Sequence, residues 1–181
     1  MKLVILDRDG VINLDSDQYI KSPEEWKPIP GSLEAIALLN QAGFRVVVCT
    51  NQSGIGRGLF DMDTLNAIHD KMIRALAQIG GHVDAIFFCP HTNADECDCR
   101  KPKPGMLREI EARFNVSLND VPAIGDSLRD LQAAQEVGAK PVLVLTGKGK
   151  KTLADPLLPR RTPNFPDLAS AVAQLLKNDP S

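Results

Sequence analysis

Asp7 and Asp9 are two carboxylates, separated by one residue, that follow an apolar run near the start of the chain. If residues 3–6 form a strand, the alternation of its side chains points both acids the same way just beyond the strand. Ligands of parallel α/β sheets bind beyond the carboxyl ends of the strands, so a paired-acid site is expected there. Two acids at such a place indicate a cation, a nucleophile or both. The alternative is an ordinary turn, because Asp accepts hydrogen bonds from nearby amides and Gly10 can adopt a positive φ.

A second pair of acids, Asp126 and Asp130, follows the apolar run 121–124. We expect Asp126 at the end of a strand and Asp130 in the first turn of the next helix, although helix capping would explain one of them equally well. Between the two pairs, Thr50 follows another apolar run and begins a glycine-rich segment, 50–58. This segment can offer donors to a phosphate, but it has the spacing of neither a Walker loop nor a dinucleotide fingerprint. An ordinary strand-to-helix connection is the alternative.

Cys89, His91, Cys97 and Cys99 fall within one short stretch and offer the four ligands that a tetrahedral structural zinc requires. With all four positions filled by protein, none is left for a reactive water, so the metal would organise a loop rather than perform chemistry. The alternative is a redox or incidental cysteine cluster. Cys49 stands apart inside an apolar run, and we expect it to be a buried core thiol.

Two cations, Arg100 and Lys101, follow the last of these cysteines. Arginine grips phosphate or sugar oxygens with a planar fork and lysine acts as a point charge, so the pair suits a phosphorylated ligand. A basic run is normally solvated surface, but here Pro102, Pro104 and the adjacent cysteine loop make the backbone stiff. A zinc-stapled loop would therefore hold both cations in place.

Composition restricts the class of protein. The 181 residues, 43% of them hydrophobic, suffice for one domain with a substantial core, and we assign residues 1–181 to a single domain. A formal net charge of -2 argues against a partner that is a nucleic acid or a membrane surface. Asp7 comes too early for a signal peptide to precede it, and no apolar run approaches the roughly 20 residues that span a bilayer. We therefore expect a cytoplasmic protein, a monomer, that binds a small molecule.

Apolar runs alternate with amphipathic segments along the chain, which is the pattern of a doubly wound α/β domain. Segment 13–30 contains three prolines and is predicted to be a loop that could fold over the site, and segment 147–166 is predicted to be irregular. His69 lies off the apolar stripe of its helix and is predicted to be solvated. The expected strands are 3–6, 44–49, 83–88, 121–124 and 142–145, and the expected helices are 32–42, 65–79, 104–114, 130–137 and 167–176.

These signals form a set, because acids, a Thr, a Lys and acids after four successive strands would all gather at one edge of a parallel sheet. The order resembles the haloacid dehalogenase superfamily of phosphotransferases, whose four motifs match Asp7-x-Asp9, Thr50, Lys101 and Gly125-Asp126-x-x-x-Asp130. Segments 7–13, 50–55, 89–91 and 97–102 look like its histidinol-phosphatase-like branch, and within it like phosphatases that act on a seven-carbon sugar bisphosphate during ADP-heptose synthesis for lipopolysaccharide. The resemblance implies an α/β fold: a Rossmann-like, three-layer domain with a mostly parallel central sheet.

A mechanism for such a phosphatase can be assigned as a hypothesis. Asp7 attacks phosphorus and forms an aspartyl-phosphate, which divides one difficult displacement into two easier ones. Asp9 protonates the departing sugar alkoxide and later deprotonates the hydrolytic water. Thr50 and Lys101 stabilise charge on the transferring phosphoryl oxygens.

Mg²⁺ is the expected catalytic metal, because it suits carboxylate and phosphate oxygens. The side chains of Asp7 and Asp126 would bind it, and the family pattern adds the backbone carbonyl of Asp9. Asp130 is expected to lie near the metal and to support its ligands without binding the ion itself. Zn²⁺ is expected only as the structural ion of the cysteine loop.

Selection of the substrate would depend on loops, because no segment is long enough for the inserted cap domain that superfamily members with large substrates commonly carry. Many relatives have Lys directly after the Gly-Asp of the fourth motif, whereas this chain has Ser127, so Arg129 or Lys148 would have to supply the missing charge. Arg8 receives no role. The expected substrate-binding residues are Asp15, Ser16, Asp17, Gln18, Asn51, Gln52, Ser53, Arg100 and Lys101.

Two other functions stay open. A histidinol-phosphate phosphatase would share the zinc loop and all four motifs, although a zwitterionic amino alcohol would favour acids rather than Arg100 near the leaving group. A non-catalytic phosphate-responsive receiver, or a zinc-dependent interaction module, is the second alternative. A receiver usually carries its phosphoacceptor after a middle strand and has no reason to keep Lys101 behind a four-ligand metal loop, which favours an enzyme.

Overall fold

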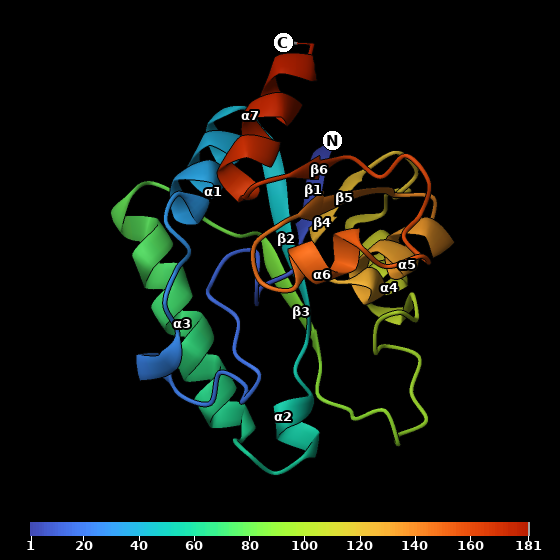
Figure 1. The fold of residues 1–181 in the computed structure, drawn as a ribbon. Coiled ribbons are helices and arrows are strands. Elements are labelled where there is room, and N and C mark those ends of the chain that lie inside the picture. The colour runs from blue at the N-terminus through green and yellow to red at the C-terminus, as the bar shows by residue number, and fades with distance from the viewer. Residues whose placement is uncertain (181) are drawn as a thin grey trace.

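Six strands form one sheet, in the order β3-β2-β1-β4-β5-β6, in the computed structural model, which describes residues 1–180 (Figure 1). Strand β1 lies between β2 and β4, and every pair of neighbouring strands is parallel. The chain runs outward from β1 to β3, crosses back to β4 and continues outward to β6. The strands are β1 (Lys2–Leu6), β2 (Phe44–Asn51), β3 (Ala85–Cys89), β4 (Pro122–Gly125), β5 (Lys140–Val144) and β6 (Asn164–Phe165).

Helices cover both faces of the sheet, which gives the three layers that the sequence predicts (Figure 1). Val4 and Leu6 face the layer that contains α1, α3 and α7, whereas Leu3 and Ile5 face α4 and α5. Burial on both faces explains why β1 is a continuous apolar run rather than an alternating one. The helices are α1 (Ser32–Gln41), α2 (Ser53–Gly56), α3 (Met62–Gln78), α4 (Gly105–Phe114), α5 (Leu128–Glu136), α6 (Gly149–Leu153) and α7 (Leu168–Asn178), and a 3₁₀ turn, η1, covers Pro23–Glu25.

Local signals at the ends of helices account for most of the predicted elements. The Asp61 carboxylate accepts a hydrogen bond from the first turn of α3, and the Asp167 carboxylate does the same for α7. Gly43, at a φ of +85°, follows the end of α1 as expected. The prediction that 147–166 is irregular is wrong in part, because this segment contains α6 and the edge strand β6. These elements are five and two residues long, too short to leave a periodic pattern.

The prediction that His69 is solvated is wrong, because the side chain lies on the buried side of α3 and the residue is 7% exposed. Its ring meets the side chain of Arg8, which is fully buried. The helical pattern gave a wrong prediction for His69 because an apolar stripe marks only the apolar residues of a buried helix face and not the polar residues that are buried beside them.

Segment 13–30 is a loop, as predicted, and one end of it is fixed to α3. Trp26 is 1% exposed, and the Lys71 ammonium of α3 donates hydrogen bonds to the carbonyls of Pro23 and Trp26 at 2.7 and 2.8 Å. The first half of the loop lies at the carboxyl edge of the sheet, where Asp15 pairs with Lys148 and Ile20 is buried in the core. Within residues 1–180, no helix is both long enough and apolar enough to cross a membrane.

Candidate active site

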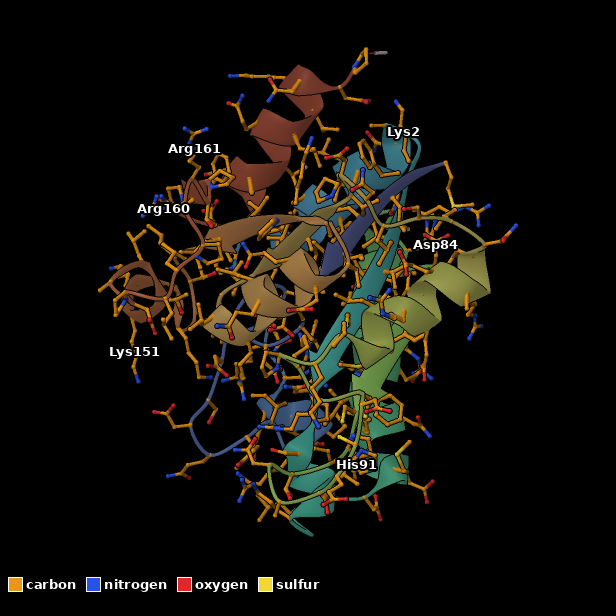
Figure 2. All side chains as sticks on the ribbon, turned by 90° about the vertical axis from the view of Figure 1, so that its right-hand side faces the viewer. Lys2, Asp84, His91, Lys151, Arg160 and Arg161 are labelled. Carbon is orange, nitrogen blue, oxygen red and sulfur yellow. The ribbon has the colours of Figure 1, made fainter. Side chains whose placement is uncertain are left out.

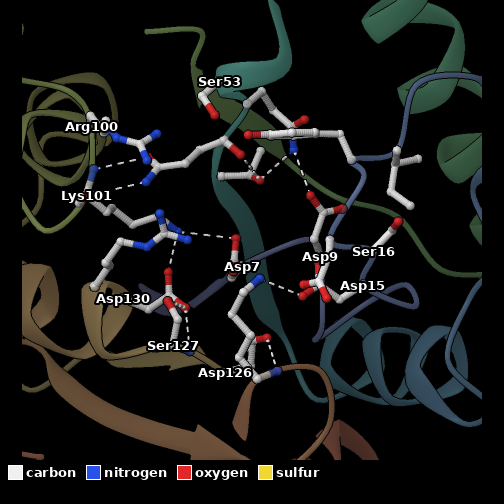
Figure 3. A pocket seen from close by; sticks show the side chains of 18 of the residues that line it. Asp7, Asp9, Asp15, Ser16, Ser53, Arg100, Lys101, Asp126, Ser127 and Asp130 are labelled. Carbon is white, nitrogen blue, oxygen red and sulfur yellow. Dashed lines mark hydrogen bonds and ion pairs between the residues drawn. The ribbon is translucent and has the colours of Figure 1, made fainter. Parts of the chain in front are cut away.

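The carboxyl ends of β1 and β4 bring the two predicted acid pairs together. These strands are neighbours in the sheet, so Asp7 and Asp126 follow side by side beyond their ends. The strand order reverses between β1 and β4, and such a switch point is where α/β sheets bind ligands. Asp7, Asp126 and Asp130 each have a carboxylate oxygen within 4.8 Å of the others. Figure 3 shows the three acids together at one pocket, with Asp9 on the side of Asp15 and Ser16.

Lys101 is the cation of this acid cluster, and it is 5% exposed. Its Nζ lies 2.7 Å from Asp130 Oδ1 and 3.2 Å from Asp7 Oδ1, and it donates a hydrogen bond to the Cys49 carbonyl at 2.7 Å (Figure 3). Burial alone would lower the pKa of Lys101, but the charges of Asp130 and Asp7 raise it above its ordinary value. Lys101 is therefore a fixed positive charge beside the oxygen atoms of Asp7.

Asp130 serves both the start of α5 and the charge cluster. Its Oδ2 accepts hydrogen bonds from the Ser127 backbone N–H and hydroxyl at 3.1 and 3.0 Å, which forms a capping box, and its Oδ1 pairs with Lys101. Burial would raise the pKa of Asp130, but Lys101 and the Ser127 donors hold it below its ordinary value. Ser127, the residue that follows the Gly-Asp of the fourth motif, thus helps to hold Asp130 in place.

Two glycines make room for Asp126. Gly10 and Gly147 have φ values of +82° and +55°, and a Cβ on either would collide with the Asp126 carboxylate. The freed space lets Asp126 Oδ2 accept a hydrogen bond from the Lys148 backbone N–H at 2.8 Å. The position of Asp126 is therefore set by backbone on both sides.

The carboxyl groups of Asp7 and Asp126 lie close together, and the nearby positive charge is too small to keep their pKa values at the ordinary level. Burial raises the pKa of Asp7 to about 7, with a further increase from Asp130 that Lys101 opposes. Burial, then Asp7 and Asp130, raises the pKa of Asp126 to about 8. Carboxylate oxygens in this state fit a hard divalent cation such as Mg²⁺. Asp7 and Asp126 have the side chains that could hold it, whereas both oxygens of Asp130 already have partners.

Asp9 lies outside the metal cluster and is surrounded by hydrogen-bond donors. Its Oδ1 accepts from Arg8 Nε and Asn13 Nδ2, both at 2.9 Å, and its Oδ2 accepts from Gln52 Nε2 at 3.1 Å. Burial would raise the pKa of Asp9, but the Arg8 charge and these hydrogen bonds lower it below its ordinary value. Gln52 Nε2 also donates to Thr50 Oγ1 at 3.0 Å, which connects the motif that follows β1 with the carboxyl end of β2.

Asn51, predicted to contact substrate, uses its side-chain amide to hold the backbone of Lys101. Its Oδ1 accepts a hydrogen bond from the Lys101 N–H at 3.0 Å, and its Nδ2 donates to the Lys101 carbonyl at 3.1 Å. Asn51 still borders the pocket, but both polar groups of the side chain have these partners. The end of β2 therefore positions the lysine.

A pocket of about 320 Å³ opens between the acids and the surrounding loops (Figure 3). Gln18 does not line this pocket, although it is predicted to bind substrate. It lies with Leu14 and Lys21 along a second hollow, and residues 16–19 around it form a turn. The predicted residues that line the pocket are Asp7, Asp9, Asp15, Ser16, Asp17, Thr50, Asn51, Gln52, Ser53, Arg100, Lys101, Asp126 and Asp130.

Three further lining residues, Tyr19, Ile20 and Arg57, carry no sequence prediction. The Arg57 guanidinium lies 6.0 Å from the centre of the Tyr19 ring, within the range of a cation–π contact between two loops. The only sequence signal for this pair is the single arginine of the glycine-rich segment 50–58.

Arg129 and Lys148, the candidates to replace the missing lysine charge, both line the pocket. Lys148 Nζ lies 2.6 Å from Asp15 Oδ2, so its charge is already paired. Among the described residues Arg129 makes no ion pair. Arg129 is thus the candidate with a free charge.

Cys89, His91, Cys97 and Cys99 converge at the end of β3, with their ligand atoms within 4.8 Å of one another. Figure 2 shows His91 beside sulfur atoms, at the opposite end of the molecule from Lys2. The Cys89 and Cys97 sulfurs are 3.9 Å apart, close to the roughly 3.8 Å expected around a tetrahedral zinc. Cys89 and Cys99 are closer, with sulfurs 2.7 Å apart, and would separate by about 1 Å around the ion. The three cysteines are free thiols, and together with the His91 imidazole they form a donor set that fits zinc.

Arg100 is held by the cysteine loop, whereas Lys101 is not. Arg100 Nε donates a hydrogen bond to Asn93 Oδ1 at 2.6 Å, and its Nη1 donates to the His91 carbonyl at 3.3 Å. Lys101 is fixed by Asn51 and by the buried acids. The expectation that one loop holds both cations is therefore wrong for Lys101.

The sequence profile of haloacid dehalogenase-like hydrolases matches residues 3–138, and the protein belongs to this family. It is therefore an enzyme, which argues against the non-catalytic alternatives. The chain is 63% identical over 177 residues to the D-glycero-β-D-manno-heptose-1,7-bisphosphate 7-phosphatase of Bordetella bronchiseptica, covering 98% of this chain and 99% of that protein. It is 55% identical over 175 residues to the protein of the same name from Pseudomonas aeruginosa, covering 97% and 98%.

Solved structures confirm the fold. The crystal structure of D,D-heptose 1,7-bisphosphate phosphatase from B. bronchiseptica, complexed with magnesium and phosphate, matches with a TM-score of 0.97 and 62% identity over 99% of this chain and 100% of that one. The corresponding enzyme from Burkholderia thailandensis matches with a TM-score of 0.79 and 54% identity over 98% and 100%. Both likenesses extend over nearly the whole chain.

Proposed function

We propose that the protein is a Mg²⁺-dependent phosphatase that removes the 7-phosphate of D-glycero-β-D-manno-heptose 1,7-bisphosphate, on the route to ADP-heptose and lipopolysaccharide. The observation that carries the proposal is the buried cluster of Asp7, Lys101, Asp126 and Asp130 at the switch point of the sheet. The end-to-end likeness to heptose bisphosphate phosphatases supports this substrate.

Histidinol phosphate suits the pocket less well than a sugar bisphosphate. Arg57, Arg100 and Arg129 all line the pocket, and they favour a second anionic group over a zwitterionic amino alcohol. The preference for the β anomer is proposed from the names of the relatives.

Asp7 is the proposed nucleophile, and its carboxylate attacks the phosphorus of the 7-phosphate. The bond from phosphorus to the sugar oxygen breaks, and Asp9 donates a proton to the departing oxygen. Asp9 then takes a proton from a water that attacks the aspartyl-phosphate, which releases phosphate and restores Asp7. Lys101 Nζ and Thr50 Oγ1 donate to the phosphoryl oxygens as charge develops on them.

The proposed ligands of Mg²⁺ are the side chains of Asp7 and Asp126 and the backbone carbonyl of Asp9. When bound, the ion would offset the negative charge that the phosphoryl group and the two acids bring together. Asp130 supports this site by holding Lys101 in place. Both pKa values that burial has raised, those of Asp7 and Asp126, would fall on binding.

Zinc is the proposed ligand of Cys89, His91, Cys97 and Cys99, and its role is structural. It would fix the loop from which Arg100 reaches the pocket. A reducing cytoplasm, the proposed location, would keep these thiols free to bind metal. We further propose that residues 1–181 form a single domain that acts as a monomer.

The rim of the pocket is proposed to select the sugar. Arg100 would bind the remote phosphate, and Ser53 would donate a hydrogen bond to the sugar. Gln52, whose two amide N–H groups go to Asp9 and Thr50, would accept one through its carbonyl oxygen. Asp15, Ser16 and Asp17 would accept hydrogen bonds from its hydroxyl groups.

Phosphate release from the purified protein with Mg²⁺ tests the proposal. The substrates are the β and α anomers of the heptose bisphosphate and histidinol phosphate, and we expect the largest kcat/KM for the β anomer. Asp7→Asn should abolish turnover, whereas Asp63→Asn, on the exposed face of α3, should not change it. Equal kcat/KM values for all three substrates would contradict the proposed specificity, and turnover by Asp7→Asn would contradict the nucleophile.

A further inference from the structure

Arg8 contacts both catalytic acids, although the proposed mechanism gives it no task. Its backbone N–H donates a hydrogen bond to Asp7 Oδ1 at 2.9 Å, and its Nε donates to Asp9 Oδ1 at 2.9 Å. Nη2 lies 2.8 Å from the same Asp9 oxygen. The side chain is fully buried, and a buried guanidinium needs several acceptors because it carries five N–H groups and no acceptor. One carboxylate oxygen cannot satisfy all of them.

His69 supplies a further acceptor from the middle of α3. Its Nε2 lies 3.1 Å from Arg8 Nη1. Because a guanidinium can only donate, Nε2 must accept, and the ring is then neutral with its proton on Nδ1. Burial, followed by the Arg8 charge, lowers the pKa of His69 to about 4, so the imidazole stays neutral at physiological pH. Arg8 is thereby held between a carboxylate and a neutral ring.

The two oxygens of Asp9 differ because of this arrangement. Oδ1 receives N–H groups from Arg8 and Asn13, whereas Oδ2 receives only the Gln52 amide. A proton on Oδ1 would have to displace two donors, one of them charged. Oδ2 is therefore the oxygen that can take up and deliver a proton, and it lies on the side of Gln52, which lines the pocket.

We propose that His69 is a positioning residue for the acid–base chemistry of Asp9. By accepting the Nη1 hydrogen bond it holds the Arg8 guanidinium against Asp9 Oδ1, which keeps Oδ2 directed at the leaving group. The inference rests on the proposed phosphatase function and on the acid–base role of Asp9. It adds a link from α3, 61 residues away in sequence, to the proton transfer.

Loss of this link should matter only where the leaving group needs a proton. A sugar alkoxide is strongly basic and depends on general acid catalysis, which is worth about 10²–10⁴-fold. The p-nitrophenolate ion is stable in neutral water and departs without a proton. A displaced Asp9 carboxylate should therefore slow the hydrolysis of the heptose bisphosphate far more than that of p-nitrophenyl phosphate.

The experiment measures kcat and KM for both esters with the Mg²⁺-loaded protein and its His69→Leu variant. We expect kcat for the heptose bisphosphate to fall about 10-fold or more, with kcat for p-nitrophenyl phosphate within about 3-fold of wild type. KM and the Mg²⁺ concentration for half-maximal activity should stay unchanged. His69→Gln, which restores an acceptor oxygen, should recover most of the lost kcat.

His82→Leu is the matched control, because the His82 side chain is 63% exposed. If His69→Leu does not fold, His69→Met fills the same space with a more adaptable apolar chain. An equal loss on both esters would mean a structural role and would overturn the inference, as would unchanged kinetics. If the wild-type protein itself hydrolyses neither ester, the proposed function fails instead, so the two failures are distinguishable.

Discussion

Replacing Lys101 with methionine removes the ammonium that lies between Asp130 and Asp7, whose side chains are only 9% and 13% exposed. The Lys101 Nζ lies 2.7 Å from Asp130 Oδ1 and 3.2 Å from Asp7 Oδ1. Removing one partner of a buried ion pair costs about 3–5 kcal/mol, because the other charge stays buried without compensation. Asp130 keeps two hydrogen bonds from Ser127, so we expect the lower end, about 3 kcal/mol. For a chain of this length that is a fall in Tm of about 6–12 °C.

Urea denaturation followed by tryptophan fluorescence measures this loss. Trp26 is the only tryptophan and is 1% exposed, so its emission reports unfolding of the core. The buffer contains no added magnesium, since bound metal would compensate part of the negative charge. Lys151→Met is the matched control, because Lys151 is an exposed lysine of α6 (Figure 2). We expect it to change the free energy of unfolding by no more than about 0.5 kcal/mol.

A double variant isolates the electrostatic cause. Asp130→Asn keeps an acceptor for Ser127 but removes the charge that Lys101 would otherwise leave unpaired. The double variant should therefore be less destabilised than the sum of the two single variants, by about 1–3 kcal/mol. A loss below about 1 kcal/mol for Lys101→Met, or strictly additive losses, would refute the reasoning that this charge cluster is a coupled unit.

The cation sites and the close glycine contact lead to three further predictions. The folded-state pKa values of Asp7 and Asp126, about 7 and about 8, lie above the ordinary value of 3.8. The native state therefore binds more protons between these limits, and metal-free stability should fall as pH rises through the window. Thermal melts should show a larger gain in Tm from Mg²⁺ at about pH 8 than at about pH 6, and Asp126→Asn should remove much of the difference. Titration with a thiol reagent should release one Zn²⁺ per chain as three cysteines react. Cys49 should stay unreactive because burial raises its pKa to about 12. Reaction of the three cysteines without release of zinc would contradict the metal site. Gly10→Ala places a Cβ against the Asp126 carboxylate at a positive φ, so the Mg²⁺ concentration for half-maximal activity should rise about 10-fold or more, and an unchanged value would mean that Asp126 does not bind the ion.

The metal-binding acids and the threonine of the site could be predicted because each lies at the carboxyl end of a strand. A parallel sheet brings the carboxyl ends of its strands to one edge, so the position of each residue in its own segment was enough to place Asp7, Thr50 and Asp126 together. The cysteine cluster is of the same kind, since three of its four ligands lie within one loop. These predictions needed topology but no detail of packing.

The contact between Arg8 and His69 could not be predicted in this way. It depends on how α3 packs against the segment that follows β1, and a helical pattern cannot distinguish a polar side chain that faces solvent from one that faces a buried cation. The place of Gln18 outside the pocket could not be predicted either, because it depends on the turn at residues 16–19. The site is thus predictable where strand direction decides and unpredictable where the packing of a helix or a turn decides.

Arg100 and Lys101 are held by different contacts, and this difference affects which sequence changes the protein can tolerate during evolution. Asn51 joins the backbone of Lys101 to β2, so segment 90–98 can lengthen, shorten or change composition without displacing the ammonium. Arg100 is attached to Asn93 and to the His91 carbonyl, so it moves with every such change. Arg100 and Lys101 would then accumulate substitutions at different rates. Arg100 would vary with the shape of the ligand, whereas Lys101 would be constrained by the chemistry of phosphate transfer.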